Sequence, residues 1–83
     1  MLFRSVGVKK FAPGDLVVFC CFNSIGLFVD PNCLTLISDL EVERDTLAIL
    51  ARHEVSADRV HMYHVILSTG ASGWTTDKFI APV

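Results

Sequence analysis

The sequence predicts an all-β fold, a small barrel of five or six strands in a strongly bent antiparallel sheet. Residues 60–83 read as strand, glycine turn, short strand, turn and final strand, with β-branched and aromatic residues in the strand segments. Hydrophobic and polar residues alternate with a period of two across 34–55. A chain of 83 residues has the volume for one hydrophobic core. Residues 1–83 are therefore expected to form a single domain.

The first elements follow from turn residues and apolar runs. Residues 1–12 show weak periodicity, which predicts a loose N-terminal arm. The segment Pro13-Gly14-Asp15 predicts a turn, because proline sets φ at the first corner and glycine relaxes the next. The continuous apolar run 16–22 predicts a strand that is covered on both faces. A second strand is expected at 26–29, and Asp30-Pro31-Asn32 ends it.

Residues 34–55 allow two interpretations. As strands, two alternating runs about a polar corner at Arg44 and Asp45 form a hairpin. As a helix, Asp45 or Thr46 caps a segment of good helix formers over 47–54. The period of two fits better and continues on both sides of the corner. The hairpin is therefore favoured, although the pattern alone leaves residues 46–54 open between strand and helix.

The last third predicts three strand segments. Residues 60–68 form the first, and the turn 69–73 follows, in which Gly70 and Gly73 permit positive φ. The segment 74–83 contains a short strand, one irregular turn and the final strand.

Composition predicts association with another protein. Hydrophobic residues make up 52% of the chain and the mean hydropathy is +0.51, so some apolar side chains are expected at the surface. Such patches mark partner surfaces. We therefore expect a homo-oligomer or a subunit of a larger assembly. A net charge of −2 and a pI near 5.8 argue against nucleic-acid binding driven by phosphate contacts.

The cysteines predict a reducing, cytoplasmic environment. Cys20, Cys21 and Cys33 are odd in number and do not resemble a disulfide framework. Neighbouring strand residues point to opposite faces, so Cys20 and Cys21 are expected to be small buried hydrophobes, inert through burial. No membrane segment is expected, because the apolar stretch 16–29 is shorter than the roughly 20 residues that span a bilayer.

No motif predicts catalysis, a metal or a cofactor. His61 and His64, three residues apart on a strand, are expected on opposite faces, where they do not share one metal ion. The glycine turn 70–73 lacks the lysine and the helix of a phosphate loop. We therefore expect a non-enzymatic protein with no cofactor, no metal and no small-molecule substrate.

Trp74 is the best candidate for binding. As the only tryptophan, next to a turn, it suits either a surface anchor or the lid of the core. Phe79 fits the core better. Tyr63 and Lys78 join Trp74 in one patch if their strands are neighbours in a hairpin. The candidate binding residues are therefore Trp74, Tyr63, Lys78 and Phe79.

The two ends of the chain resemble SH3-type barrels. The segment 73–82 resembles their closing strand and 3₁₀ turn, and 13–17 is similar to the opening of small SH3-like barrels, including short phage-encoded and bacterial proteins. The resemblance implies an SH3-like barrel. Peptide-binding SH3 domains carry proline where this chain has Thr76, and tyrosine where it has Phe79. Since Tyr63 is the only tyrosine, recognition of proline-rich peptides is not expected.

The Sm/LSm-like barrel is the second resemblance. That family forms rings by edge pairing of a strongly bent sheet, which high hydrophobicity and a long hairpin at 34–55 would suit. Its RNA-contact pattern, an Asp-x-Asn loop and a later Arg-Gly pair, is absent. Asp30-Pro31-Asn32 has the residue types of the loop, but Pro31 makes the segment a turn and no Arg-Gly pair follows. The function expected is thus a protein-interaction module, a self-associating subunit or assembly scaffold. An Sm-like ring that binds RNA is the alternative and is not favoured.

Overall fold

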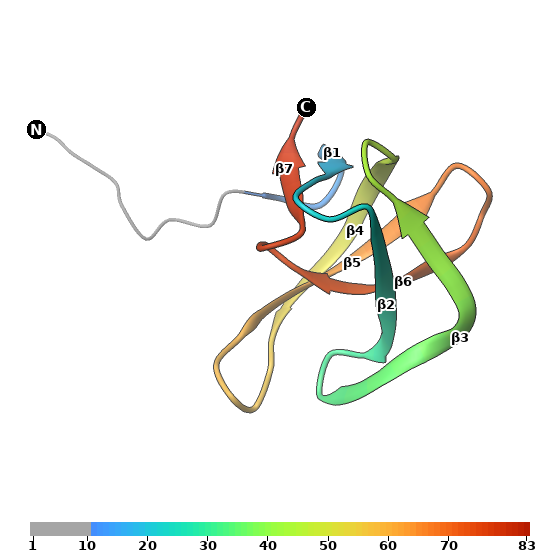
Figure 1. Ribbon diagram of the computed structural model, residues 1–83. Coiled ribbons are helices and arrows are strands. Elements are labelled where there is room, and N and C mark those ends of the chain that lie inside the picture. The colour runs from blue at the N-terminus through green and yellow to red at the C-terminus, as the bar shows by residue number, and fades with distance from the viewer. Residues whose placement is uncertain (1–10) are drawn as a thin grey trace, which may run out of the picture.

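The computed structural model describes residues 11–83, without the side chains of residues 33 and 34, and this part forms one antiparallel sheet (Figure 1). Its strands are β1 (Leu16–Phe19), β2 (Ser24–Asp30), β3 (Cys33–Glu43), β4 (Leu47–Val55), β5 (His61–Leu67), β6 (Ser72–Thr76) and β7 (Ile80–Pro82). They lie in the order β3-β2-β6-β5-β4-β1-β7. The sheet curls strongly into a half-barrel whose edges are β3 and β7. Within residues 11–83 no helix is long and apolar enough to cross a membrane.

The all-β prediction is confirmed, but the number of strands is seven rather than five or six. The two shortest strands are β1, with four residues, and β7, with three. Both complete one margin of the sheet, where β1 pairs with β4 and with β7. Residues 46–54, open between strand and helix in the sequence, belong almost entirely to β4.

The hairpin predicted for 34–55 is wrong in its pairing. Both halves are strands, but β3 pairs with β2, and β4 pairs with β1 and β5. The corner between them turns through Asp45, whose φ is +72°. There the Asp45 N–H donates to the Phe19 carbonyl at 2.8 Å, and the Arg44 N–H donates to the Asn23 carbonyl at 3.1 Å. These bonds hold the corner against the end of β1 and the β1–β2 loop. The chain then continues into β4, which pairs with β1 and β5 instead of folding back on β3.

The strand predicted for 16–22 ends early, at Phe19. Cys21 has a φ of +81°, a left-handed conformation that breaks an extended strand. The other predicted turns are confirmed. Gly14 and Gly70 take positive φ, and the Asn32 N–H donates to Asp30 Oδ1 at 2.8 Å. Gly73, however, lies inside β6 rather than in the turn.

The core lies on one face of the sheet, inside the curl. Its buried hydrophobic cluster comprises Phe11, Val17, Phe19, Ile25, Leu27, Val42, Ala48, Leu50, Tyr63, Val65, Leu67 and Ile80. Alternation along each strand produces this face, because every second side chain points inward. Phe11 packs edge-on against Tyr63, with ring centroids 5.4 Å apart. Of the predicted arm 1–12, only residues 11 and 12 lie within the described part.

Candidate functional site

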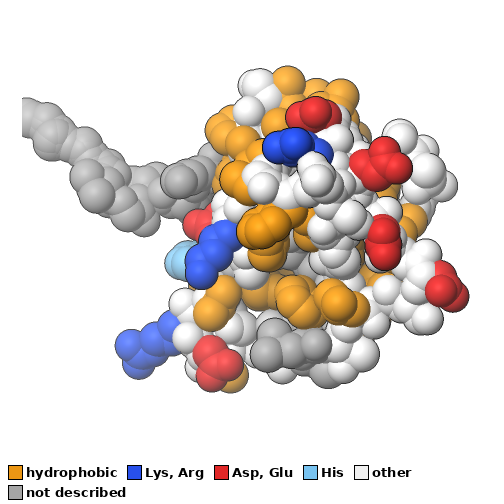
Figure 2. All heavy atoms as spheres, in the orientation of Figure 1, with side chains coloured by type: hydrophobic (Ala, Val, Ile, Leu, Met, Phe, Trp, Pro, Cys, Tyr) orange, Lys and Arg blue, Asp and Glu red, His pale blue; other side chains and the backbone are white. Residues whose placement is uncertain are grey.

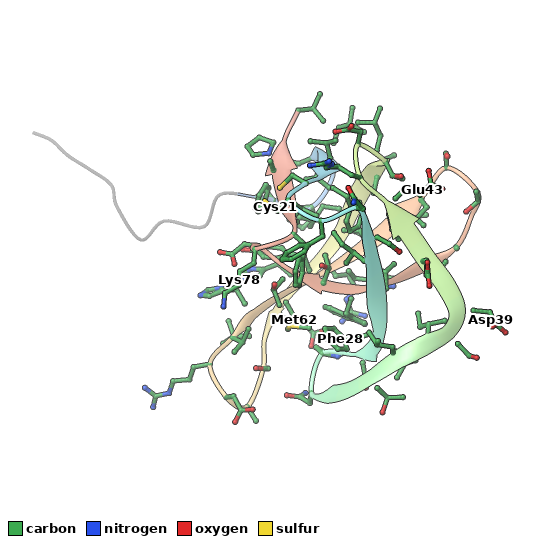
Figure 3. The ribbon with its side chains drawn as sticks, in the orientation of Figure 1. Cys21, Phe28, Asp39, Glu43, Met62 and Lys78 are labelled. Carbon is green, nitrogen blue, oxygen red and sulfur yellow. The ribbon has the colours of Figure 1, made fainter. Side chains whose placement is uncertain are left out.

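A groove of about 300 Å³ lies where three turns converge. Its walls come from β2 and the β2–β3 turn, from the β4–β5 turn and the start of β5, and from β6 and the β6–β7 turn. The lining residues are Phe28, Pro31, Asn32, Ser56, Ala57, Asp58, Val60, Met62, Thr76, Asp77, Lys78 and Phe79. Figure 3 labels one residue from each of three walls, namely Phe28, Met62 and Lys78. The floor is apolar and the rim is polar, which is typical of a binding site.

Hydrogen bonds between and within the turns hold the groove open. The Ala57 N–H donates to Asn32 Oδ1 at 2.8 Å, which ties the β4–β5 turn to the β2–β3 turn. Within the β4–β5 turn, the Ser56 N–H donates to the Val60 carbonyl at 2.8 Å. Within the β6–β7 turn, the Phe79 N–H donates to the Thr76 carbonyl at 3.2 Å. Backbone hydrogen bonds therefore fix two of the turns, and the Asn32 side chain ties the β2–β3 turn to the β4–β5 turn.

The electrostatic character of the groove is mildly acidic. Asp58 and Asp77 carry carboxylates on the rim, and Lys78 is the cation there. The lining includes neither histidine nor cysteine, so it lacks the usual partners of an activated nucleophile.

The structure separates the four predicted binding residues. Lys78 and Phe79 both line the groove. Tyr63 is a core residue, 2% exposed, and Trp74 is 7% exposed. The two aromatic residues lie on opposite faces, because Tyr63 pairs with Thr75 while His64 pairs with Trp74. The strands are neighbours as expected, yet Tyr63 and Trp74 do not share one patch.

Trp74 belongs to a row of side chains that crosses five strands. Successive cross-strand partners are Arg52, His64, Trp74, Phe28 and Leu36. The His64 ring tilts over Trp74 with centroids 5.0 Å apart. Burial, and then the Arg52 guanidinium, lowers the pKa of His64 below its ordinary value of 6.5. Trp74 thus covers the side of the sheet opposite the core.

His53 and His61 form a second contact that the sequence did not predict. His53 Nε2 lies 2.7 Å from His61 Nδ1, and the two rings are stacked with an interplanar angle of 7°. Tyr63 stacks on the other side of His53, with centroids 4.8 Å apart. Among the described side chains, no group of three or more histidine, cysteine or acidic residues is placed to hold a metal ion.

An aliphatic patch lies on the surface of β1, β4 and β5. Leu16, Ile49 and Ile66 are successive cross-strand partners, and Leu47 precedes Ile49 by two residues on the same face. Each of these four residues is between 41% and 52% exposed. Together they line a shallow, almost wholly apolar depression. High hydropathy predicted surface patches, but only the strand register reveals which residues meet.

Comparison with protein-family models, with curated proteins and with solved structures finds no significant match to this chain. The functional argument therefore depends on the geometry of the groove and of the aliphatic patch.

Proposed function

We propose that the protein is a non-enzymatic interaction module that associates with a second copy of itself through the aliphatic patch. One observation supports this most strongly: Leu16, Leu47, Ile49 and Ile66 are contiguous, about half exposed, and drawn from three neighbouring strands. Burial of such side chains contributes about 25 cal/mol for each Å² of apolar surface removed from water. A contiguous patch of this kind is typical of protein–protein contact.

A second copy is the occupant that the patch favours. Its four side chains carry no charge or hydrogen-bonding group, so the best complement is another aliphatic surface, which a two-fold axis supplies. The patch offers a few hundred Å², less than the roughly 800 Å² per partner of a stable dimer. The self-association is therefore weak and depends on concentration.

Variants on β4 test this proposal. Leu47→Thr and Ile49→Thr each remove exposed aliphatic surface while keeping a residue that suits strands. We expect both to shift sedimentation-equilibrium mass towards the monomer, with a dissociation constant raised about tenfold. That change corresponds to about 1.4 kcal/mol.

The matched control is Val55→Thr, on the same strand and 54% exposed but outside the patch. It should self-associate as the wild type does. If Val55→Thr weakens association as much as Ile49→Thr, or if neither patch variant changes the mass, the aliphatic patch is not the interface.

The groove supports a second candidate, the docking of an extended segment from a partner protein. Its apolar floor and its two rim carboxylates, Asp58 and Asp77, favour aliphatic side chains beside a lysine or arginine. A random peptide library displayed on beads tests this, with Asp77→Lys as the variant that reverses an exposed charge on the rim. Selected peptides should be aliphatic and basic and should bind Asp77→Lys more weakly. Peptides that bind both proteins equally would contradict groove docking.

RNA binding by an Sm-like ring is the weaker proposal. Outside residues 1–10 the chain carries nine acidic residues and four basic ones. On the face in Figure 2, the Lys and Arg side chains lie apart instead of forming one basic patch. Titration with labelled single-stranded RNA should show no saturable binding. Binding that weakens steeply with salt would favour the ring instead.

An SH3-like barrel and a cytoplasmic location complete the proposal. The strongly curled sheet and the turn before β7 support the first. The free thiols of Cys20 and Cys21 support the second, because reducing compartments keep thiols unpaired.

A further inference from the structure

The loop after β1 brings two neighbouring thiols into contact. On an extended strand Cys20 and Cys21 would point to opposite faces. The positive φ of Cys21, +81°, turns the chain so that both side chains lie on one side. A hydrogen bond joins the two thiols, with the Cys20 and Cys21 sulfur atoms 3.2 Å apart. Figure 3 shows Cys21 in this loop.

The backbone around this thiol pair is anchored on both sides. The Cys20 N–H donates to the Phe79 carbonyl at 2.9 Å. Phe19, one residue earlier, donates to the Thr46 carbonyl at 2.9 Å and accepts from the Asp45 N–H at 2.8 Å. These bonds fix the backbone of Phe19 and Cys20, while Cys21 is exposed to solvent and Cys20 is partly buried.

We infer that Cys20 and Cys21 form a redox-sensitive dithiol, which a hydroperoxide converts reversibly into a disulfide between adjacent residues. Cys21 first loses its proton to solvent. Its thiolate attacks one peroxide oxygen and breaks the O–O bond, which produces a sulfenic acid and a hydroxide that takes up a proton from solvent and leaves as water. The Cys20 sulfur then attacks the Cys21 sulfur, and the sulfenic hydroxyl leaves with the Cys20 proton as a second water. Two thiols and one hydrogen peroxide thus become one S–S bond and two waters.

The surroundings of the two thiols indicate which one reacts with the peroxide and which one then attacks the sulfenic acid. Cys21 is exposed and meets the oxidant first. The hydrogen bond with Cys21, then partial burial and the charge of the neighbouring thiolate, raises the pKa of the Cys20 thiol. Cys20 therefore keeps its proton until the sulfenic acid has formed, and then supplies it to the departing water.

Strain makes the disulfide reversible. Neighbouring Cα atoms are about 3.8 Å apart across a trans peptide, whereas disulfides usually join Cα atoms about 4.4–6.8 Å apart. A bond across adjacent residues is therefore strained, and strained exposed disulfides are the readily reduced ones. Such a bond serves as a switch rather than as a structural crosslink.

Formation of the disulfide between Cys20 and Cys21 is expected to move the β1–β2 loop, which contacts Phe79. The sulfur atoms must approach from 3.2 Å to about 2.05 Å. Phe22, the next residue, packs edge-on against Phe79 with centroids 5.4 Å apart. Oxidation is therefore expected to shift the amide NMR signals of Phe22 and Phe79, while those of the distant β2–β3 turn stay in place.

Mass spectrometry after mild oxidation tests the inference. The reduced, folded protein is treated with a small excess of hydrogen peroxide. The mass of the peptide that contains Cys20 and Cys21 is then measured. We expect it to lose the mass of two hydrogen atoms and to regain it with dithiothreitol. The loss should be about tenfold faster, or more, than in the same protein unfolded in guanidinium, because the fold holds the thiols in contact.

Serine variants supply the controls. Cys33→Ser should behave as the wild type, whereas Cys20→Ser should accumulate a sulfenic acid on Cys21 that dimedone traps. The inference is overturned if the mass loss disappears in Cys33→Ser, if the wild type only gains oxygen, or if folded and unfolded chains react at the same rate.

Discussion

Thr75 is the residue whose environment conflicts most with its chemistry. Thr75 is 1% exposed. Its Oγ1 is buried and, in the described part of the chain, has no hydrogen-bond partner. A buried hydroxyl without a partner forfeits its hydration and lowers the stability of the folded state.

Thr75→Val is accordingly expected to raise the free energy of unfolding by about 1 kcal/mol, because it replaces the hydroxyl with a methyl group of similar shape. Urea denaturation followed by Trp74 fluorescence measures this. Thr75→Ser is the control: it keeps the hydroxyl, removes a methyl and should be less stable than the wild type. A destabilised Thr75→Val would mean that the hydroxyl has a partner after all.

His64 couples stability to pH. Its pKa is lowered below 6.5 in the folded protein, mainly by burial and also by Arg52. In the unfolded chain the imidazole takes up a proton near its ordinary pKa, so between the two values the unfolded state binds more protons. The contribution of His64 is complete above about pH 6.5 and is lost as the pH falls through the folded pKa.

We therefore expect wild-type stability to fall as the pH is lowered below about 6.5, and the stability of His64→Gln to fall less over the same range. Urea denaturation of both proteins at each pH measures the difference, which separates the contribution of His64 to the pH dependence of stability from that of the other histidines. Identical pH dependence in both proteins would contradict a lowered pKa at this residue.

At the scale of elements, Gly73 shows how closely β2 approaches β6. A Cβ atom at this position would lie 2.6 Å from Leu27 Cβ and 2.9 Å from Ile37 Cδ1, and Leu27 is a fully buried core residue. The glycine thus permits the close approach of two strands, rather than forming a turn.

Gly73→Ala should cost about 2 kcal/mol or more of unfolding free energy, because the backbone of one strand must move. Gly26→Ala is the matched control on a neighbouring strand. Its Cβ would meet the flexible end of Leu36, at 3.1 Å, and should cost less than about 1 kcal/mol. Thermal unfolding of the two variants checks the difference. A Gly73→Ala protein as stable as the wild type would show that the strands have room to separate.

The elements also show what the sequence could predict. Alternation and turn residues located β2, β4 and β5, and the turns at Gly14 and Gly70, because these signals are local. The sequence could not predict which strands pair, because alternation assigns side chains to the two faces of a strand but does not identify the neighbouring strand. The left-handed Cys21 had no local signal, since the residue is neither glycine nor asparagine.

The same reasoning applies to the candidate site. Lys78 and Phe79 were among the predicted binding residues, and both line the groove, although Lys78 was expected beside Trp74 and Phe79 was expected to fit the core better. Met62 and Phe28 were missed, since each becomes part of the groove only through the sheet order. The aliphatic patch was predicted as a property of the whole composition, while its members depended on the register of β1, β4 and β5.

At the scale of the whole molecule, the described surface differs in character between the edge strand β3 and the face formed by β1, β4 and β5. The acidic strand β3 forms one edge of the sheet, and its carboxylates disfavour pairing with another chain there. Aliphatic side chains are instead contiguous on β1, β4 and β5. Self-association through that face would leave the groove free, because the two surfaces share no lining residue.

Light scattering of the wild-type protein over a wide concentration range, at low and at high salt, tests this central claim most directly. The proposed aliphatic contact predicts a mass that rises with concentration and stays as high, or becomes higher, when salt is added, because salt screens charges but not apolar burial. A monomer at every concentration, or an oligomer that dissociates in high salt, would contradict the proposal.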